Sequence, residues 1–287
     1  MLTRKIGPVA VSAIGLGGMP MSIEGRPAEE RSIRTIHAAL DAGLTLIDTA
    51  DAYHLNAGET GHNERLIARA LASYGGDTSG VLVATKGGHL RPGDGSWTLD
   101  GSPAHLRDAA EASLKALGVD AIGLYQFHRP DPKVPYAESV GALRELLDAG
   151  KIRQAGISNA SIEQIDIALR VLGEGNLASV QNQFSPAFRS SEPELRHCAA
   201  LGIAFLPFRP LGGIGRAGQL GARHAAFQRI ADYRGASPQQ VTLAWMLAKA
   251  PVVIPIPGAS RPASVTDSAG AAGLVLAAAE LDQLDRG

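Results

Sequence analysis

The stretch LIDTADAY, residues 46–53, places side chains capable of acid–base chemistry directly after an apolar run. Asp48 ends the run and Tyr53 follows it closely, with Asp51 between them. A carboxylate and a phenol at the end of a buried strand could take part in proton transfer, or could mark a strand that runs out into a polar loop. We expect Asp51 to support the loop rather than the chemistry. The choice depends on which other polar groups reach the same place.

Two further apolar runs also end on residues that can do chemistry. Lys86 ends the run VLVATKGG, and His128 ends the run IGLYQFH. If these residues meet Asp48, that carboxylate is the obvious partner of Lys86, since a buried ammonium group needs a counter-charge. A cation beside Tyr53 favours the phenolate and would lower the pKa of the phenol from its reference value of about 10. His128 could hold the oxygen of a bound carbonyl while negative charge develops there. The four residues predict a proton donor for a carbonyl that accepts a hydride.

The elements that must position these residues are visible as a repeated alternation. Eight apolar runs of strand length cover 13–19, 44–50, 81–88, 122–128, 152–159, 179–184, 203–208 and 252–258. Segments of helical period cover 29–42, 63–74, 103–117, 136–149, 161–172, 192–201 and 238–249. Eight buried strands with crossover helices predict an α/β fold, a (β/α)8 TIM barrel, in one domain over 1–287. The first dozen residues predict a short N-terminal β-hairpin that covers the bottom of the barrel.

An open doubly wound sheet is the alternative fold. Its dinucleotide fingerprint needs a third glycine, and in GLGGMP the residue at that place is Pro20. The barrel is therefore favoured, and in a barrel the chemistry lies at the C-terminal ends of the strands. The later runs bring further polar and aromatic residues to that end, namely Ser158, Asn159, Gln181, Asn182, Phe208 and Arg209.

Capping residues agree with the expected helix boundaries. Ser102 and Ser237 each precede a proline, which is a favourable pair of N-cap and first-turn residues. Gly118, Gly150 and Gly202 follow expected helices at the place where a left-handed residue ends a helix.

Composition excludes several classes of partner. The 287 residues include 27 basic and 28 acidic side chains, so there is no electrostatic case for nucleic acid or an anionic membrane as partner. No targeting signal and no long apolar segment is present, and we expect a cytoplasmic monomer. The single cysteine, Cys198, lies in a helical pattern and is expected to be a buried small hydrophobe. No histidines have ligand spacing with a carboxylate or cysteine, so no metal is predicted.

The sequence resembles the aldo-keto reductases over nearly its full length. The resemblance rests on GLGGM, DTADAY, ATKGG, LYQFHRP, GKIRQAGISN, QNQFSP, PFRPLGG and VIPIPGASR, in this order. It implies that Asp48, Tyr53, Lys86 and His128 form a catalytic tetrad with Tyr53 as general acid. It also implies NADPH/NADP+ as the cofactor, with NADH as the less favoured alternative. The cofactor would lie extended across the barrel mouth and deliver a hydride to an aldehyde or ketone.

The resemblance also implies which residues would hold the cofactor. Ser158, Asn159 and Gln181 have the groups needed to fix a nicotinamide carboxamide, Phe208 would stack on its ring, and Arg261 could pair with a 2′-phosphate. The full set comprises Gly18, Met19, Asp48, Ser158, Asn159, Gln181, Phe208, Arg209, Pro210, Leu211, Gly212, Gly213, Ile256, Gly258, Ala259, Ser260, Arg261, Ser264 and Asp267.

Two segments depart from the family pattern. Arg209 stands where the family often has serine and could contact the pyrophosphate. SVTDSAG, 264–270, replaces the usual residues near the adenine. The loop after Tyr53 is longer than is common. The segment after the seventh run is short and the chain ends soon after its last helix, so we expect an open, permissive pocket.

Substrate contacts are expected from Tyr53, His54, Trp97, His128 and Arg129, with a small-molecule carbonyl compound as substrate. Trp97 could equally clamp its own loop. Two other functions compete with a reductase. One is a redox-sensing or regulatory subunit that binds NADPH with little turnover. The other is a Schiff-base lyase with Lys86 as nucleophile, which a protonated Lys86 paired with Asp48 disfavours. The substrate and the direction of the reaction cannot be read from the sequence.

Overall fold

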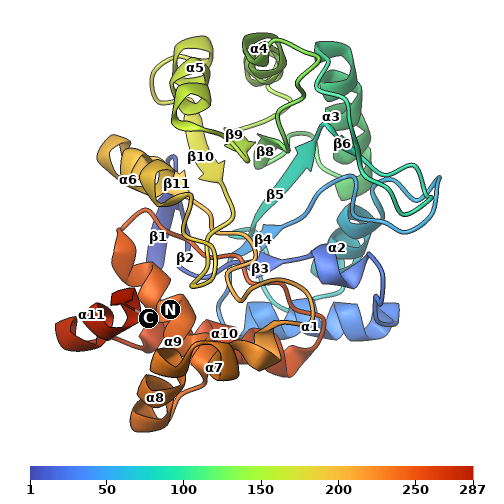
Figure 1. The fold of residues 1–287 in the computed structure, drawn as a ribbon. Helices are drawn as coiled ribbons and strands as arrows, with labels where there is room; N and C mark the ends of the chain where they lie inside the picture. Colours follow the sequence, from blue (N-terminus) through green and yellow to red (C-terminus); the bar gives the residue numbers. More distant parts are fainter. Residues whose placement is uncertain (287) are drawn as a thin grey trace.

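The computed structural model describes residues 1–286, and its centre is a curled parallel sheet. Seven strands pair in the order β11-β10-β9-β8-β5-β4-β3, and helices surround them (Figure 1). The strands are β3 (Leu16–Gly17), β4 (Leu46–Asp48), β5 (Leu82–Gly87), β8 (Leu124–Phe127), β9 (Ala155–Ser158), β10 (Leu177–Gln181) and β11 (Ala204–Phe205).

Residues 252–258 occupy the eighth position and close the barrel. Ile254 and Ile256 donate their N–H groups toward β11, and the carbonyls of Pro255 and Pro257 accept N–H groups from the β3 side. Proline has no N–H, and here each proline stands where that group would have faced β3. The expected eighth segment thus makes hydrogen bonds to both of its neighbours, although it does not form a regular strand. The prediction of a (β/α)8 barrel is confirmed.

Eight helices follow the eight strand positions. They are α1 (Glu29–Asp41), α2 (His62–Ala72), α3 (Pro103–Leu117), α4 (Tyr136–Asp148), α5 (Ile162–Leu172), α6 (Glu192–Leu201), α9 (Pro238–Lys249) and α10 (Pro262–Gly270). The expected helices 103–117, 192–201 and 238–249 have the predicted bounds. Residues 206–237, after β11, are longer than expected, because they include α7 (Leu220–Arg223) and α8 (Ala225–Arg234). The helix α11 (Ala278–Arg286) ends the described chain.

The expected caps are confirmed. The hydroxyl of Ser102 accepts the N–H of His105 at the start of α3, and that of Ser237 accepts the N–H of Gln240 at the start of α9. Gly118, Gly150 and Gly202 have φ angles of 68°, 69° and 70°, which side chains rarely adopt.

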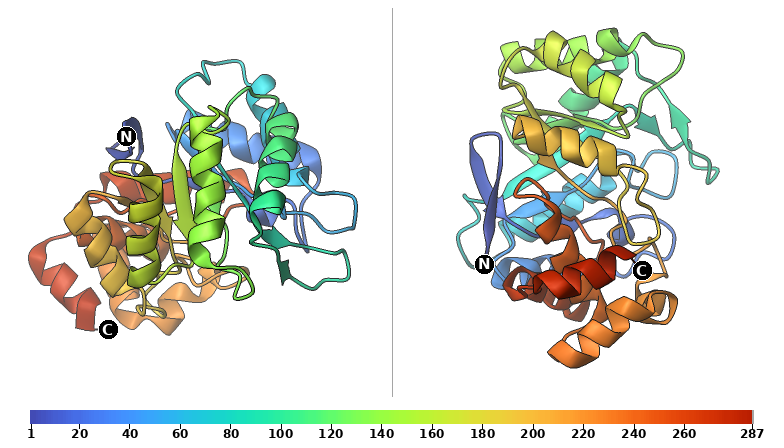
Figure 2. Two further views of the ribbon diagram at one scale, coloured as in Figure 1. Left: turned by 90° about the horizontal axis from the view of Figure 1, so that it is seen from above. Right: turned by 60° about the vertical axis from the view of Figure 1, so that its left-hand side comes forward.

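Two hairpins lie at opposite ends of the barrel (Figure 2). The N-terminal hairpin pairs β1 (Thr3–Ile6) with β2 (Val9–Ser12), as predicted. Its Ile6 and Val11 are buried in the cluster that fills the barrel interior. The second hairpin pairs β6 (His89–Leu90) with β7 (Thr98–Leu99) at the C-terminal ends of the strands and was not predicted.

Cys198 is buried, and burial raises the pKa of its thiol to about 12, as expected for a small hydrophobe in the core. Within residues 1–286, no helix is long and apolar enough to cross a membrane. The same residues hold no group of three or more His, Cys, Asp or Glu side chains arranged to bind a metal ion.

Candidate active site

A buried ion pair lies at the C-terminal end of β4 and β5. Lys86 Nζ is 2.7 Å from Asp48 Oδ2, as predicted, and the side chain of Lys86 is fully buried. Lys86 Nζ also donates to the carbonyl of Thr49 at 2.7 Å and to the hydroxyl of Tyr53 at 3.4 Å. All three N–H donors of the ammonium group therefore have an acceptor, which is the condition for keeping a charge in the barrel interior.

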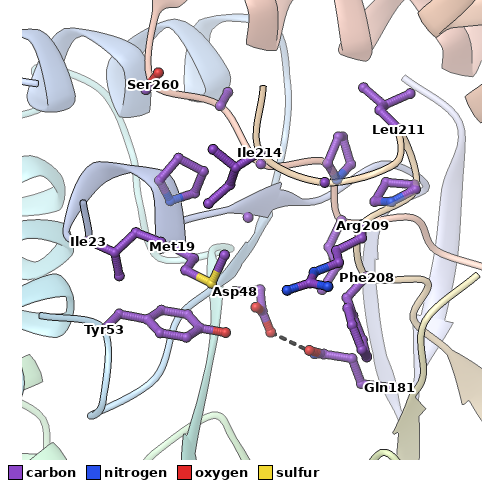
Figure 3. A pocket seen from close by; sticks show the side chains of 18 of the residues that line it. Met19, Ile23, Asp48, Tyr53, Gln181, Phe208, Arg209, Leu211, Ile214 and Ser260 are labelled. Carbon is purple, nitrogen blue, oxygen red and sulfur yellow. Dashed lines mark hydrogen bonds between the residues drawn. The ribbon is translucent and has the colours of Figure 1, made fainter. Parts of the chain in front are cut away.

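The second oxygen of Asp48 is held by two glutamines. Gln181 Nε2 donates to Asp48 Oδ1 at 2.7 Å (Figure 3), and Gln126 Nε2 lies 3.5 Å from the same atom. Sequence reasoning missed Gln126. Its signal was available, since Gln126 lies on β8 two residues before His128, which directly follows the strand, and alternate residues of an extended chain face the same side. Asp48 is thus fixed from three strands and cannot turn away from Lys86.

The pKa of Tyr53 shifts opposite to the expected direction. Burial raises the pKa above its usual value of 10.0, Lys86 lowers it, and Asp48 raises it again. The sequence showed the cation but not the depth of burial, and burial is the larger effect. Tyr53 is therefore a phenol that keeps its proton at neutral pH, with Lys86 poised to stabilise the phenolate once that proton leaves.

Lys86 and His128 have opposite protonation states at neutral pH. Burial disfavours the charge on Lys86, but Asp48 and Tyr53 outweigh it and raise the pKa of the ammonium group. Burial and the neighbouring Lys86 hold the pKa of His128 well below 6.5, so its imidazole is neutral. His128 Nδ1 is buried without a partner among residues 1–286. Burying an unpaired N–H is unfavourable, so the proton belongs on Nε2.

The tetrad opens into a long cavity of about 960 Å³. Tyr53 and His128 line one end, with ring centroids 5.8 Å apart, while Lys86 lies behind the wall. Of the expected cofactor residues, those that line the cavity are Met19, Asp48, Ser158, Asn159, Gln181, Phe208, Arg209, Pro210, Leu211, Gly213, Ile256, Gly258, Ala259, Ser260, Arg261 and Ser264. The expected residues thus form one continuous surface.

The amide-bearing residues form a linked group beside the tetrad. Asn159, with a φ of 57°, donates to the carbonyl of His128 at 3.0 Å and to the hydroxyl of Ser158 at 3.0 Å. The Ser158 hydroxyl donates to the carbonyl of Gln181 at 2.8 Å. Arg129 donates to the Asn159 amide oxygen at 3.2 Å. By contrast, the side-chain amide of Asn182 accepts the N–H of Ala160 and donates to the carbonyl of Ala160. Asn182 therefore stabilises the loop that contains Ala160.

A loop after β11 forms the wall opposite Tyr53. Figure 3 shows Phe208 and Arg209 on that side, with the guanidinium of Arg209 extending into the cavity. Arg209 has a φ of 52° and Gly213 a φ of 102°, so the loop turns sharply at both residues. Ile214 lines the cavity beyond them and was not predicted.

The far end of the cavity lies at the start of α10. Arg261 is the residue before this helix, it is exposed, and its Nε donates to the Ser264 hydroxyl at 2.9 Å. Ser260 completes this end. A cation, two hydroxyls and a helix N-terminus together suit an anionic group.

Besides Lys86, four expected site residues do not line the cavity. The N–H of Gly18 donates to the carbonyl of Asp48, and Gly212 lies in the loop after Arg209. Asp267 accepts from Ser237 at 2.8 Å and from Gln240 at 3.0 Å, which turns its carboxylate toward α9. His54 is buried, and its Nδ1 lies 2.9 Å from the carbonyl of Asn56.

The substrate half of the cavity contains residues that sequence reasoning missed. Trp97 and Arg129 line it as expected, together with Ile23, Glu24, His89 and Leu99. The ring of His89 is 4.7 Å from Trp97 and 4.9 Å from His128, between centroids. Burial lowers the pKa of His89 to about 4, so it adds no charge at neutral pH. The hairpin that carries His89 could not be anticipated from hydrophobic periodicity, since its strands are too short.

Comparison with known proteins gives one consistent result. The model of the Aldo/keto reductase family matches residues 13–286. A 6-dehydroglucose reductase of Novosphingobium aromaticivorans is 34% identical, with 93% of this chain and 89% of that protein covered.

Solved structures give the same result. The glycerol dehydrogenase of Gluconobacter oxydans has a TM-score of 0.83 and 30% identity, covering 99% of this chain and 94% of that one. An aldo-keto reductase of Klebsiella pneumoniae, crystallised in complex with NADPH, has a TM-score of 0.80 and 31% identity, covering 100% and 95%.

Proposed function

This chain belongs to the aldo/keto reductase family, and we propose that it reduces aldehydes or ketones to alcohols with NADPH as hydride donor and Tyr53 as general acid. One observation carries the proposal. Lys86 is fully buried and bonded to both Asp48 and Tyr53, while Tyr53 and His128 face the same cavity. A protonated phenol backed by a fixed cation, beside a neutral imidazole, is suited to protonate a carbonyl oxygen.

The cavity fits an extended dinucleotide. It runs from the tetrad past Phe208 and Arg209 to Arg261 and Ser264, with cations where phosphates would lie. Gly17 and Gly258 let the cavity wall pack closely, since a Cβ on Gly17 would lie 2.9 Å from the Ile256 carbonyl oxygen and one on Gly258 would lie 2.9 Å from Pro20. NADPH, which the Klebsiella pneumoniae relative binds, would supply the hydride when bound.

Each tetrad residue has a separate role in this proposal. His128 donates its Nε2 proton in a hydrogen bond to the carbonyl oxygen and fixes its direction. Tyr53 transfers its phenolic proton to that oxygen as the carbonyl carbon accepts the hydride, which gives the alcohol. Lys86 stabilises the resulting phenolate, and Asp48 keeps Lys86 charged throughout. Solvent then returns a proton to Tyr53.

The test is consumption of NADPH by the purified protein with a panel of small aldehydes and ketones, followed by absorbance. We expect turnover with several aldehydes, formation of the matching alcohol, and weaker activity with NADH because Arg261 would lose its phosphate partner. Tight binding of NADPH with no consumption on any member of the panel would contradict the proposal.

A further inference from the structure

Arg91 is a buried cation in contact with Glu24 and Trp97, two residues that line the cavity. It lies between β6 and β7, and only 5% of its surface is exposed. Burying a guanidinium group is unfavourable unless its charge and donors are matched. The hairpin that carries Arg91 projects from the barrel (Figure 2), and the carbonyl and the carboxylate that Arg91 contacts both belong to other segments.

Arg91 joins three segments that are distant in sequence. One terminal nitrogen donates to the backbone carbonyl of His54, directly after Tyr53. The other pairs with the carboxylate of Glu24, in the loop that follows β3. The guanidinium carbon lies 4.9 Å from the centre of the Trp97 ring, at the far end of its own loop. These contacts tie the hairpin to the loop that carries Tyr53.

Trp97 is the residue that this arrangement places against the cavity. Its ring packs on Arg91 and on His89, which itself contacts His128, and 38% of Trp97 stays exposed. Trp97 and Leu99 line the cavity. Contact with a cation and a histidine restrains the indole, while its exposed part lines the cavity, and aromatic rings attract planar partners.

We propose that Arg91 is a positioning residue for substrate selectivity, which fixes Trp97 as the wall against which planar substrates bind. The proposal rests on the reductase function above. A substrate too small to reach Trp97 does not depend on Arg91, and an aromatic aldehyde does. Selectivity between the two then depends on a residue that contacts neither substrate nor cofactor.

The first turn of α2 offers a matched control. Arg65 is exposed and also donates to backbone carbonyls, those of Thr60 at 2.9 Å and Glu59 at 3.2 Å, but it does not line the cavity. Arg91→Met and Arg65→Met therefore remove the same charge and the same kind of backbone anchor. Only the first removes contact with Trp97.

Kinetics with benzaldehyde and propanal test the proposal. Arg91→Met is expected to raise KM for benzaldehyde about 10-fold, because benzaldehyde loses its stacking on Trp97. For propanal, which does not reach Trp97, kcat/KM should change by less than about 2-fold. Trp97→Leu should give the same pattern, and the double variant should add little to either single change. Arg65→Met should leave both substrates unaffected. Equal effects of Arg91→Met on both aldehydes, or additive effects of the two changes, would overturn the proposal.

Fluorescence tests the positioning of Trp97 without turnover. The chain has two tryptophans, and Trp245 is buried, so acrylamide quenching reports Trp97. Arg91→Met is expected to increase quenching at least about 2-fold, as an ordered side chain becomes mobile. If that variant does not fold, Glu24→Gln, which removes the exposed partner charge, should increase quenching as well. Unchanged quenching would overturn the proposal, whereas a wild-type protein without turnover would instead contradict the reductase function.

Discussion

In the proposed mechanism, proton transfer at this site depends on Lys86. Its ammonium group has no contact with solvent, and its acceptors come from Asp48, Thr49 and Tyr53. Removing Asp48 would leave a buried unpaired charge, which is strongly unfavourable. The same arrangement disfavours Lys86 as a nucleophile, because its lone pair stays protonated.

Replacing Lys86 with methionine should abolish most of the activity, and it should lower stability as well, because Asp48 stays buried without its cation. Methionine fills a similar volume, but the phenolate of Tyr53 loses its cation. We expect kcat to fall about 100-fold to 10,000-fold. Lys151→Met is the control, since Lys151 pairs with Glu111 at the surface. A Lys86→Met enzyme with near wild-type kcat would contradict the role of Lys86.

The protonation states predict an unusual pH profile. In the proposed reaction Tyr53 acts only while protonated, and burial raises its pKa above 10.0. His128 is already neutral well below pH 6.5. Between roughly pH 7 and 9, kcat/KM for reduction should therefore stay flat, and it should fall only as the pH rises through the pKa of Tyr53. An inflection near pH 6.5 that disappears in His128→Gln would contradict this account.

The meeting of the four central side chains could be predicted, but their electrostatics could not. Residue type and position at strand ends brought Asp48, Tyr53, Lys86 and His128 together, because barrel strands present their ends at one face. The direction of the Tyr53 pKa shift was predicted wrongly, because depth of burial depends on how neighbouring loops pack.

At the scale of elements, the junction of α9 and α10 explains the position of Asp267. Its carboxylate accepts from the Ser237 hydroxyl and from Gln240, at the first turn of α9. Ser237 in turn caps α9. Asp267 thereby links the two helices that carry the far end of the cavity, while Arg261 and Ser264 of the same region face into it.

Asp267→Ala should lower the stability of the protein without changing the affinity for NADPH. We expect a loss of about 1 kcal/mol in the free energy of unfolding, measured with urea, from the missing hydrogen bonds. Ser264→Ala, by contrast, should weaken NADPH binding and leave the stability unchanged. A large loss of NADPH affinity in Asp267→Ala, with stability intact, would show that this carboxylate binds the cofactor.

Elements with long periodic patterns were predictable, and short or irregular ones were not. The helix at 238–249 has the predicted bounds, because proline, serine and apolar periodicity agree there. Residues 252–258 lack a regular strand because Pro255 and Pro257 cannot donate. The strands β6 and β7 have two residues each, too few to show a period.

At the scale of the whole molecule, contacts of α11 hold the end of the described chain against the barrel. Asp285 accepts from the indole N–H of the buried Trp245 at 2.7 Å and pairs with Lys249. Arg189 donates to the Asp285 carbonyl at 2.8 Å. The contacts reach α9, the segment before α6, and the core around Trp245, so a surface helix is tied to three parts of the fold.

Asp285→Ala should destabilise the whole barrel and leave its kinetics unchanged. The indole N–H of Trp245 would lose its acceptor, which costs about 1–3 kcal/mol for a buried donor. Urea unfolding measures this change, and Asp282→Ala, an exposed position on the same helix, is the control. Equal stability of the two variants would show that α11 is not held by Asp285.

Closure of the barrel brings the tetrad and the cavity to one end of the molecule, and proton donation by Tyr53 is the central claim about that end. The most direct measurement is single-turnover oxidation of bound NADPH by an aldehyde, in wild type and Tyr53→Phe, with NADPH affinity measured separately. We predict NADPH affinity within about 3-fold of wild type and a hydride-transfer rate lower by about 100-fold to 10,000-fold. A Tyr53→Phe protein that oxidises NADPH at the wild-type rate would contradict the account.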